Sequence, residues 1–114
     1  MAERRMISKK IIYKNSFLDL SDGAISLYLF LIIEADDDGF VDGLRRMPRC
    51  SFVSRKNLSE LINAGFVIQF KSGVLLIVHW KKQNSVARDR YSPTEYKAEL
   101  SQVFIDDDGS YRLM

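Results

Sequence analysis

Cysteine, histidine and proline are scarce in this sequence, and no apolar run is long. Its 114 residues include one cysteine, one histidine and two prolines. A single cysteine, Cys50, excludes an intramolecular disulfide and a zinc site built from several thiolates, and it fits a reducing cytoplasm. The apolar run 25–33 is about half as long as a membrane-spanning helix needs, and it ends at Glu34. Because 1–10 lacks a secretory signal, we expect a cytoplasmic protein without a membrane partner.

Side chains that could support catalysis or bind a cofactor are equally few. His79 has no obvious nucleophile partner and no second histidine with which to bind a metal. The Asp-Asp-Asp-Gly stretches at 36–39 and 106–109 lack the alternating oxygen ligands of a calcium loop, and they predict solvated turns. The glycines form neither common phosphate-binding pattern. We therefore expect no enzymatic activity, metal or cofactor, and packing roles for His79 and Cys50.

The net charge is small, but the charges are unevenly distributed. The whole chain carries +2, from 17 basic and 15 acidic residues, whereas 43–82 holds eight basic residues and only Glu60 as an acid. Most of the acidic residues lie elsewhere, in 36–38, at Asp42 and in 106–108. This separation predicts one positive face, which is typical of nucleic-acid-binding proteins. An ordinary solvated surface is the alternative that charge alone leaves open.

Composition favours a single α+β domain. With 46% apolar residues the chain can bury enough surface to fold, and its length suits one hydrophobic core. We expect that core over about 7–82 and an arm, helix and tail over about 83–114. Ser21 or Asp22 can cap a helix that is apolar on nearly every face, so this helix should be the centre of the core. Its apolar residues are Ile25, Leu27, Tyr28, Leu29, Leu31, Ile32 and Ile33.

The stretch 54–80 is the most informative part of the chain. Ser54 is a good N-cap, apolar residues from Leu58 to Ile62 recur at helical spacing, and Gly65 can end the helix. Two segments rich in β-branched and aromatic residues follow, at 66–70 and 74–80, and a short turn separates them. This order predicts a recognition helix followed by a wing, as in a winged helix-turn-helix domain.

The preceding segments complete this prediction. Residues 44–50 predict the first helix of the helix-turn-helix, which Pro48 would shorten or distort, and 51–53 predict the turn. Phe40–Val41 predicts a short strand that joins the hairpin as its third member. A short first helix is expected within 11–18.

The C-terminal part is predicted to be a loop, a helix and a hairpin or tail. Residues 83–91 are polar and lack periodicity, which predicts an irregular arm. Ser92 can cap a helix with Pro93 in its first turn, and we expect this helix to reach about Val103. Residues 104–113 then form a hairpin or a loose tail. The aromatic rings at 80, 91 and 96 could stack on bases, although packing is the alternative.

The start of the predicted recognition helix carries the expected DNA contacts. An α-helix fits the major groove, where arginine can read guanine and asparagine can read adenine, while serine and lysine contact phosphates. Lys71 at the wing tip could reach a phosphate or the minor groove. The alternative is that these are ordinary exposed cations. The predicted DNA-binding residues are Arg45, Arg46, Arg49, Ser54, Arg55, Lys56, Asn57, Lys71, Lys81 and Lys82.

Six short segments, taken in order and spacing, suggest a family. They are 5–12 (RMISKKII), 35–41 (ADDDGFV), 65–67 (GFV), 72–74 (SGV), 79–80 (HW) and 89–94 (DRYSPT). Together they resemble phage and prophage replication proteins, the replisome organisers, which begin with a winged-helix domain similar to that of the DnaD primosome protein.

The resemblance implies non-catalytic DNA binding during replication initiation, with primosome assembly or loading of the replicative helicase. Duplex DNA is expected in preference to single strands, and a helicase, a helicase loader and a second copy of the chain are the candidate protein partners. Two other functions would use the same elements. One is a transcriptional regulator with a two-fold symmetric operator, and the other is an assembly module that self-associates without DNA.

Overall fold

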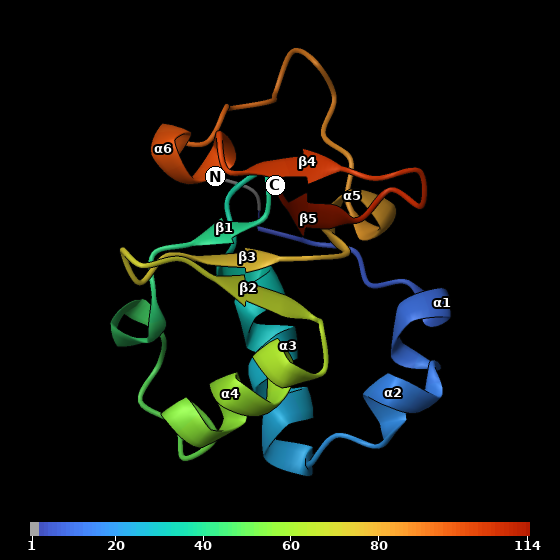
Figure 1. Ribbon diagram of the computed structural model, residues 1–114, viewed down its shortest axis with the longest axis vertical. Helices are drawn as coiled ribbons and strands as arrows, with labels where there is room; N and C mark the ends of the chain where they lie inside the picture. The colour runs from blue at the N-terminus through green and yellow to red at the C-terminus, as the bar shows by residue number, and fades with distance from the viewer. Residues whose placement is uncertain (1–2) are drawn as a thin grey trace.

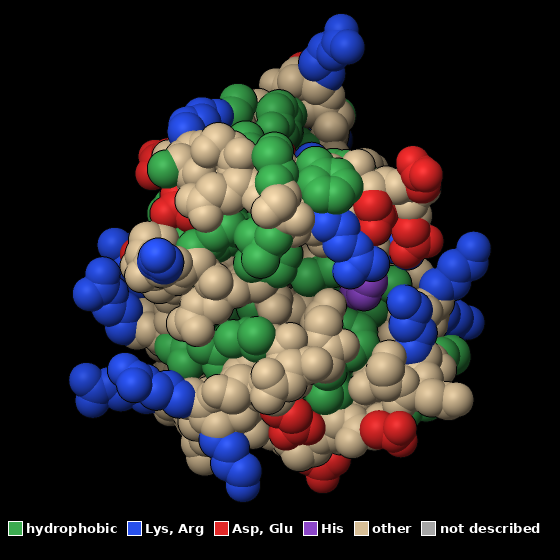
Figure 2. All heavy atoms as spheres, viewed as in Figure 1, with side chains coloured by type: hydrophobic (Ala, Val, Ile, Leu, Met, Phe, Trp, Pro, Cys, Tyr) green, Lys and Arg blue, Asp and Glu red, His purple; other side chains and the backbone are tan. Residues whose placement is uncertain are grey.

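The chain folds into an α+β arrangement with two small antiparallel sheets, described for residues 3–114 in a computed structural model (Figure 1). Charged side chains lie mainly around the edge of the viewed surface, and apolar and uncharged polar groups cover its middle (Figure 2). Within 3–114, no helix is both long and apolar enough to cross a membrane. The helices are α1 (Lys9–Ile12), α2 (Asn15–Leu18), α3 (Asp22–Glu34), α4 (Arg55–Asn63), α5 (Trp80–Gln83) and α6 (Lys97–Leu100), with a 3-10 turn η1 (Leu44–Arg46). The strands are β1 (Phe40–Val41), β2 (Val67–Gln69), β3 (Leu75–Ile77), β4 (Val103–Ile105) and β5 (Tyr111–Leu113).

The central helix α3 lies where the sequence predicts it. Ser21 has extended backbone, and its hydroxyl oxygen accepts a hydrogen bond from Ala24 N at 3.2 Å, so the predicted cap is confirmed. One side of α3, which includes Tyr28 and Ile32, is fully buried. The predicted helix within 11–18 is divided into two four-residue helices, α1 and α2.

Strands β1, β3 and β2 form a three-stranded sheet in that order. Val41 lies opposite Leu75, which confirms that the short strand pairs with the hairpin. The β2–β3 turn contains Gly73, whose φ is +93°. Because glycine lacks a Cβ atom, it adopts this left-handed backbone at little cost, so the turn forms as predicted.

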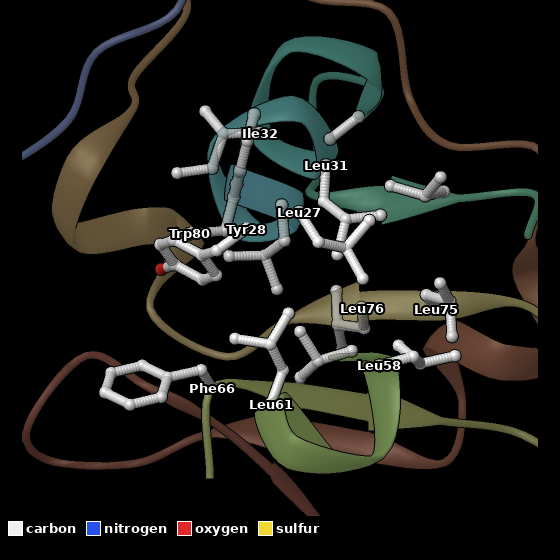
Figure 3. Close-up of a cluster of buried hydrophobic side chains, with 14 of the residues drawn as sticks. Leu27, Tyr28, Leu31, Ile32, Leu58, Leu61, Phe66, Leu75, Leu76 and Trp80 are labelled. Carbon is white, nitrogen blue, oxygen red and sulfur yellow. The ribbon is translucent and has the colours of Figure 1, made fainter. Parts of the chain in front are cut away.

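The hydrophobic core lies between α3 and the layer made by α4 and the sheet. Leu27 and Leu31 of α3 point toward Leu61 of α4 and Leu76 of β3 (Figure 3). All four side chains are fully buried. This packing holds α4 in place from one side only, so its other side remains available to solvent.

The terminal hairpin of β4 and β5 docks on this core. Tyr111 N donates a hydrogen bond to Val78 O at 2.9 Å, and the Tyr111 hydroxyl donates to Asp38 O at 2.9 Å. His79 Nδ1 lies 3.0 Å from Ser110 Oγ. Of the two alternatives for the C-terminus, the structure therefore contains the hairpin and not the loose tail.

The predicted helix 44–50 is wrong beyond its first turn. Only Leu44–Arg46 is helical, as a 3-10 turn, and Met47 already has extended backbone with ψ of 158°. Pro48 explains the stop, because proline lacks an N–H donor and disfavours helical backbone in the residue before it. The chain then reaches α4 through irregular backbone and a turn at 51–53, as predicted for that turn.

The predicted helix from Ser92 to Val103 is also too long. The Ser92 N–H donates to Asp37 Oδ2 at 3.0 Å, and the Thr94 hydroxyl donates to Asp36, so groups expected to start a helix bind aspartates instead. Helix α6 covers only Lys97–Leu100, and Val103 belongs to β4.

The predicted strand 74–80 ends early. β3 stops at Ile77, and Trp80 is the first residue of α5. The indole Nε1 donates to Asp37 O at 2.9 Å. This hydrogen bond and the burial of the whole ring stabilise a turn after β3 that directs the Trp80 side chain into the core. His79 and Trp80 therefore do not belong to the strand.

The turn 36–39 is largely withdrawn from solvent, with Asp36 and Asp37 half-buried and Asp38 buried, which corrects the prediction of a solvated turn. Asp36 Oδ1 accepts hydrogen bonds from Asp38 N and Phe40 N, both at 3.0 Å. Asp38 is 3% exposed, and its carboxylate accepts hydrogen bonds from Thr94 N and the Tyr91 hydroxyl. The aspartates of this turn therefore bind a segment more than fifty residues away.

The second Asp-Asp-Asp-Gly turn has the same backbone pattern at the surface. Asp106 Oδ1 accepts from Asp108 N and Ser110 N, both at 2.9 Å. Asp107 and Asp108 are exposed, so this turn does fit the prediction. The two turns show that local sequence determines the turn geometry, whereas contacts with distant residues determine whether the turn is buried.

Candidate nucleic-acid interface

The first turn of α4 presents two cations to solvent. Ser54 has extended backbone, and its hydroxyl accepts a hydrogen bond from Asn57 N at 3.2 Å, so the predicted N-cap is confirmed. Arg55 and Lys56 follow and are both exposed. The free backbone N–H groups at a helix N-terminus and nearby cations favour negative charge in the same region.

The solvent-facing side of α4 is polar and free of carboxylates. Arg55, Ser59 and Asn63 recur every four residues, and all three are exposed. Glu60, the acidic residue of the helix, accepts hydrogen bonds from Ser21 N and Ser21 Oγ at 2.6 and 2.8 Å. These bonds lower the pKa of Glu60, so its charge is held against the start of α3. Ser59 and Asn63 are absent from the predicted set, although their helical spacing from Arg55 could have identified them.

A shallow groove beside α4 brings Arg45 and Arg55 together. Its walls come from η1, α4 and the β2–β3 turn, which contributes Ser72 and Gly73, and its volume is about 550 Å³. The neighbouring Arg46 forms an ion pair with Asp42, with Nε 2.8 Å from Oδ2. Three segments that are distant in sequence therefore meet at this groove.

Basic side chains gather along the left edge of the molecule in Figure 2, over η1, the β2–β3 turn and the start of α4. Lys71, the neighbour of Ser72 in the β2–β3 turn, and Arg49, in the segment that joins η1 to α4, are both exposed. Two acids reach it, because Asp42 pairs with Arg46 and Glu99 Oε2 accepts a hydrogen bond from Ser72 Oγ at 2.6 Å. We call this region the basic face: Arg45, Arg46, Arg49, Arg55, Lys56 and Lys71.

Lys81 and Lys82 lie apart from the basic face. Both belong to α5, which lies at the opposite end of the sheet from η1 (Figure 1). Lys81 Nζ pairs with Asp38 Oδ1 at 3.2 Å, and Lys82 pairs with Asp108 of the terminal hairpin. Each lysine therefore neutralises a carboxylate of the protein itself.

Asn57 is held inside the contact between α3 and α4. Its Nδ2 donates to Phe52 O at 2.8 Å. The amide also lies against Gly23, where an added Cβ atom would come within 2.5 Å of Nδ2. In this position Asn57 lies against the start of α3 and is bonded to the turn before α4, and it is not among the exposed residues of α4.

The three aromatic rings considered for base stacking have different surroundings. Trp80 is fully buried, so packing is confirmed for this ring. Tyr96 is half-buried and packs against Phe40, with ring centroids 6.1 Å apart. Tyr91 is 41% exposed, but its hydroxyl is bound to Asp38.

His79 is buried and neutral at physiological pH. Burial lowers the pKa of His79 to about 4, and the nearby cations Lys14, Lys82 and Arg112 contribute in the same direction. Its ring meets that of Phe66 edge to face, with centroids 5.7 Å apart. No group of three His, Cys, Asp or Glu side chains within 3–114 could hold a metal ion.

Comparison with protein-family models, with curated proteins and with solved structures finds no match to this chain. The α+β fold and the positions of the exposed cations are therefore the observations from which a function is inferred.

Proposed function

We propose that this chain is a winged-helix domain that binds duplex DNA without catalysis. The element order α3–β1–η1–α4–β2–β3, with the sheet order β1–β3–β2, supports a winged helix in which η1 stands for the first helix of the helix-turn-helix. The observation that carries the proposal is the basic face, because exposed cations from η1, α4 and the β2–β3 turn lie on one side of the molecule.

In this proposal α4 enters the major groove with its solvent-facing side. Arg55 and Asn63 are the exposed residues there that can read guanine and adenine, respectively. Arg45 and Lys56 flank the helix and contact phosphates, which position the helix without reading sequence. Lys71, at the wing tip, contacts the adjacent backbone or the minor groove.

The proposed process is phage-type replication initiation, in which the domain acts as a replisome organiser that assembles a primosome. This part rests on the resemblance in six sequence segments. A helicase or helicase loader is the proposed protein partner. A transcriptional regulator would instead require an operator with two-fold symmetry, so mapping the bound sequence distinguishes the two.

The test is the salt dependence of duplex binding by the variant Arg45→Ala/Lys56→Ala, which removes the two proposed phosphate contacts that flank the helix. Each phosphate contact contributes about 0.9 to the slope of log K against log salt concentration, so loss of two contacts lowers the slope by about 1.8. The matched control is Lys9→Ala/Lys10→Ala, which removes the same charge from exposed positions on α1, away from the basic face. Equal slopes for wild type and both variants, or no binding by wild type in dilute salt, would refute the proposal.

Self-association without DNA is the second candidate function. Phe30 and Ile33 on the outer side of α3 are 40% and 54% exposed, and such apolar side chains favour contact with another protein surface. Sedimentation measures the oligomeric state. Stable oligomers that bind no DNA would favour this function over the first.

A further inference from the structure

The loop between α5 and α6 is fastened at its first end by a side-chain amide. Asn84 Oδ1 accepts a hydrogen bond from Met6 N at 2.8 Å, and Asn84 Nδ2 donates to Met6 O at 3.0 Å. Asn84 is buried, so this pair of bonds is shielded from water. The N-terminal segment thereby holds the start of the loop.

The second end of the loop is fastened to the aspartate turn. The Tyr91 hydroxyl lies 2.8 and 2.7 Å from the two carboxylate oxygens of Asp38, and Thr94 N donates to the same carboxylate at 2.9 Å. Burial alone would raise the pKa of Asp38, but the hydrogen bonds from Tyr91, Thr94 and Lys81 outweigh burial and lower it. The carboxylate is therefore charged at neutral pH and anchors the loop.

Between these two anchors the side chains have no partners. We call residues 85–90 the strap. Among residues 3–114, no side chain of the strap makes a hydrogen bond or an ion pair, and its internal bond is from Arg90 N to Ala87 O at 2.9 Å. Arg88, Asp89 and Arg90 are all exposed. The strap projects beyond the rest of the molecule at the top of Figure 1, where Figure 2 shows a basic side chain at its tip.

The strap and the basic face border a common groove. Arg90 and Arg46 both line this groove, which has a volume of about 1000 Å³. Its lining carries both signs of charge, because Arg4 and Arg5 join these two arginines and face Glu34, Asp36, Asp37, Asp42 and Glu95, so the interior offers a polyanion no net positive charge. The exposed arginines of the strap are therefore better placed to contact a polyanion than the interior of the groove.

We propose that Arg88 and Arg90 form a second DNA contact, which binds phosphates of the duplex outside the segment that α4 contacts. This inference rests on the proposed function. Arginine suits the role because its guanidinium binds phosphate oxygens in pairs, and these two have no carboxylate partner in the described structure. Anchors at both ends hold the two side chains ready, which reduces the entropy lost on binding.

The spacing of the two contacts sets a minimum length of duplex. Helix α4 and the strap lie at opposite ends of the longest axis of the molecule, along which the Cα atoms span 36 Å (Figure 1). At roughly 3.4 Å per base pair, this span corresponds to roughly 11 base pairs, which is the upper limit for the separation of α4 and the strap. A duplex of about 8 base pairs, roughly 27 Å long, is shorter than this span and should favour one contact, whereas a duplex of about 20 base pairs exceeds it and can reach both.

The experiment compares wild type with Arg88→Ala/Arg90→Ala on hairpin-closed duplexes of the two lengths, by fluorescence anisotropy over a range of salt concentrations. On the long duplex the slope of log K against log salt concentration should fall by about 1.8 for the variant. If the variant and wild type bind equally at 1 M salt, the variant should then bind roughly 60-fold more weakly than wild type at 0.1 M salt. On the short duplex the variant should match wild type. Asp89→Asn should tighten binding to the long duplex, because it removes the one negative charge of the strap.

The outcomes separate this inference from the proposed function. If wild type binds the long duplex and Arg88→Ala/Arg90→Ala has an unchanged slope, the strap contact is wrong while DNA binding by the basic face stands. If wild type binds neither duplex, both are wrong. The charge-preserving variant Arg88→Lys/Arg90→Lys should retain the slope, and a loss of slope there would also contradict a phosphate contact.

Discussion

Replacing Gly39 by alanine should strongly destabilise the fold, because two separate costs meet at this residue. Its φ is +96°, a backbone conformation that other residues rarely adopt. An added Cβ atom would also lie 2.6 Å from Cγ and 2.7 Å from Cβ of Trp80. Trp80 is fully buried, and its Nε1 is hydrogen-bonded to Asp37 O, so the ring has no free space into which to move.

The magnitude follows from these two terms. Left-handed backbone costs a residue with a Cβ atom about 1–2 kcal/mol, and overfilling a packed core costs about 1–3 kcal/mol. The lower entropy of alanine in the unfolded chain returns about 0.4–1 kcal/mol. We therefore expect Gly39→Ala to lower the free energy of unfolding by about 3 kcal/mol, and Tm by roughly 12 °C at about 4 °C per kcal/mol.

Gly73 offers a matched control. Its φ is +93°, but no atom lies within 4 Å of an added Cβ. Gly73→Ala therefore incurs only the backbone term, and we expect a loss of about 1 kcal/mol. Urea unfolding followed by far-ultraviolet circular dichroism measures both variants. If Gly39→Ala and Gly73→Ala lose the same stability, the steric contact with Trp80 contributes nothing and the reasoning is wrong.

Two further predictions concern buried polar contacts. The pKa of His79 is lowered to about 4 in the folded chain, from a value near 6.5 in the unfolded chain. Between these two pH values the unfolded chain binds more protons than the folded chain. The free energy of unfolding should therefore fall by about 3 kcal/mol as pH falls from 7 to 4. His79→Asn should remove that part of the pH dependence in acid unfolding curves, and NMR titration of the single histidine should give a midpoint near 4; a midpoint near 6.5 would contradict burial as the cause. Tyr91→Phe removes the hydrogen bonds to Asp38 and should lower the free energy of unfolding in urea by about 1 kcal/mol. The control Tyr13→Phe changes a tyrosine that is 65% exposed and should cause no measurable loss. Equal losses for the two variants would show that the Asp38 contact is not stabilising.

Elements with strong local signals could be predicted from the sequence. The Ser21 cap and the apolar run after it locate α3, and Ser54 with Gly65 bounds α4 closely. The β2–β3 turn needs glycine at a positive φ, and the sequence supplies Gly73 there. In each case a few neighbouring residues determine the backbone, so no knowledge of the rest of the fold is required.

Other elements depend on partners that are distant in the chain. Ser92 has the side chain of a helix cap, yet its N–H binds Asp37, which lies 55 residues earlier. Nothing near Ser92 indicates that an aspartate turn will lie beside it. The same contacts bury Asp38, although the local sequence is typical of a solvated turn and the similar turn 106–109 is solvated. Long-range contacts of this kind override local propensity, and periodicity does not reveal them.

Whether a cation is available to DNA depends on the same long-range contacts. Lys81 and Lys82 count fully in the charge of 43–82, but each is paired with an aspartate that lies far from it in sequence. Arg88 and Arg90 lie outside that segment and have no such partner among residues 3–114. Because a cation already paired with a carboxylate gains less from a phosphate, charge counted along the sequence overstates how many cations of 43–82 are available to a polyanion. The positive surface is therefore better defined by unpaired side chains, which extend it from α4 toward the strap.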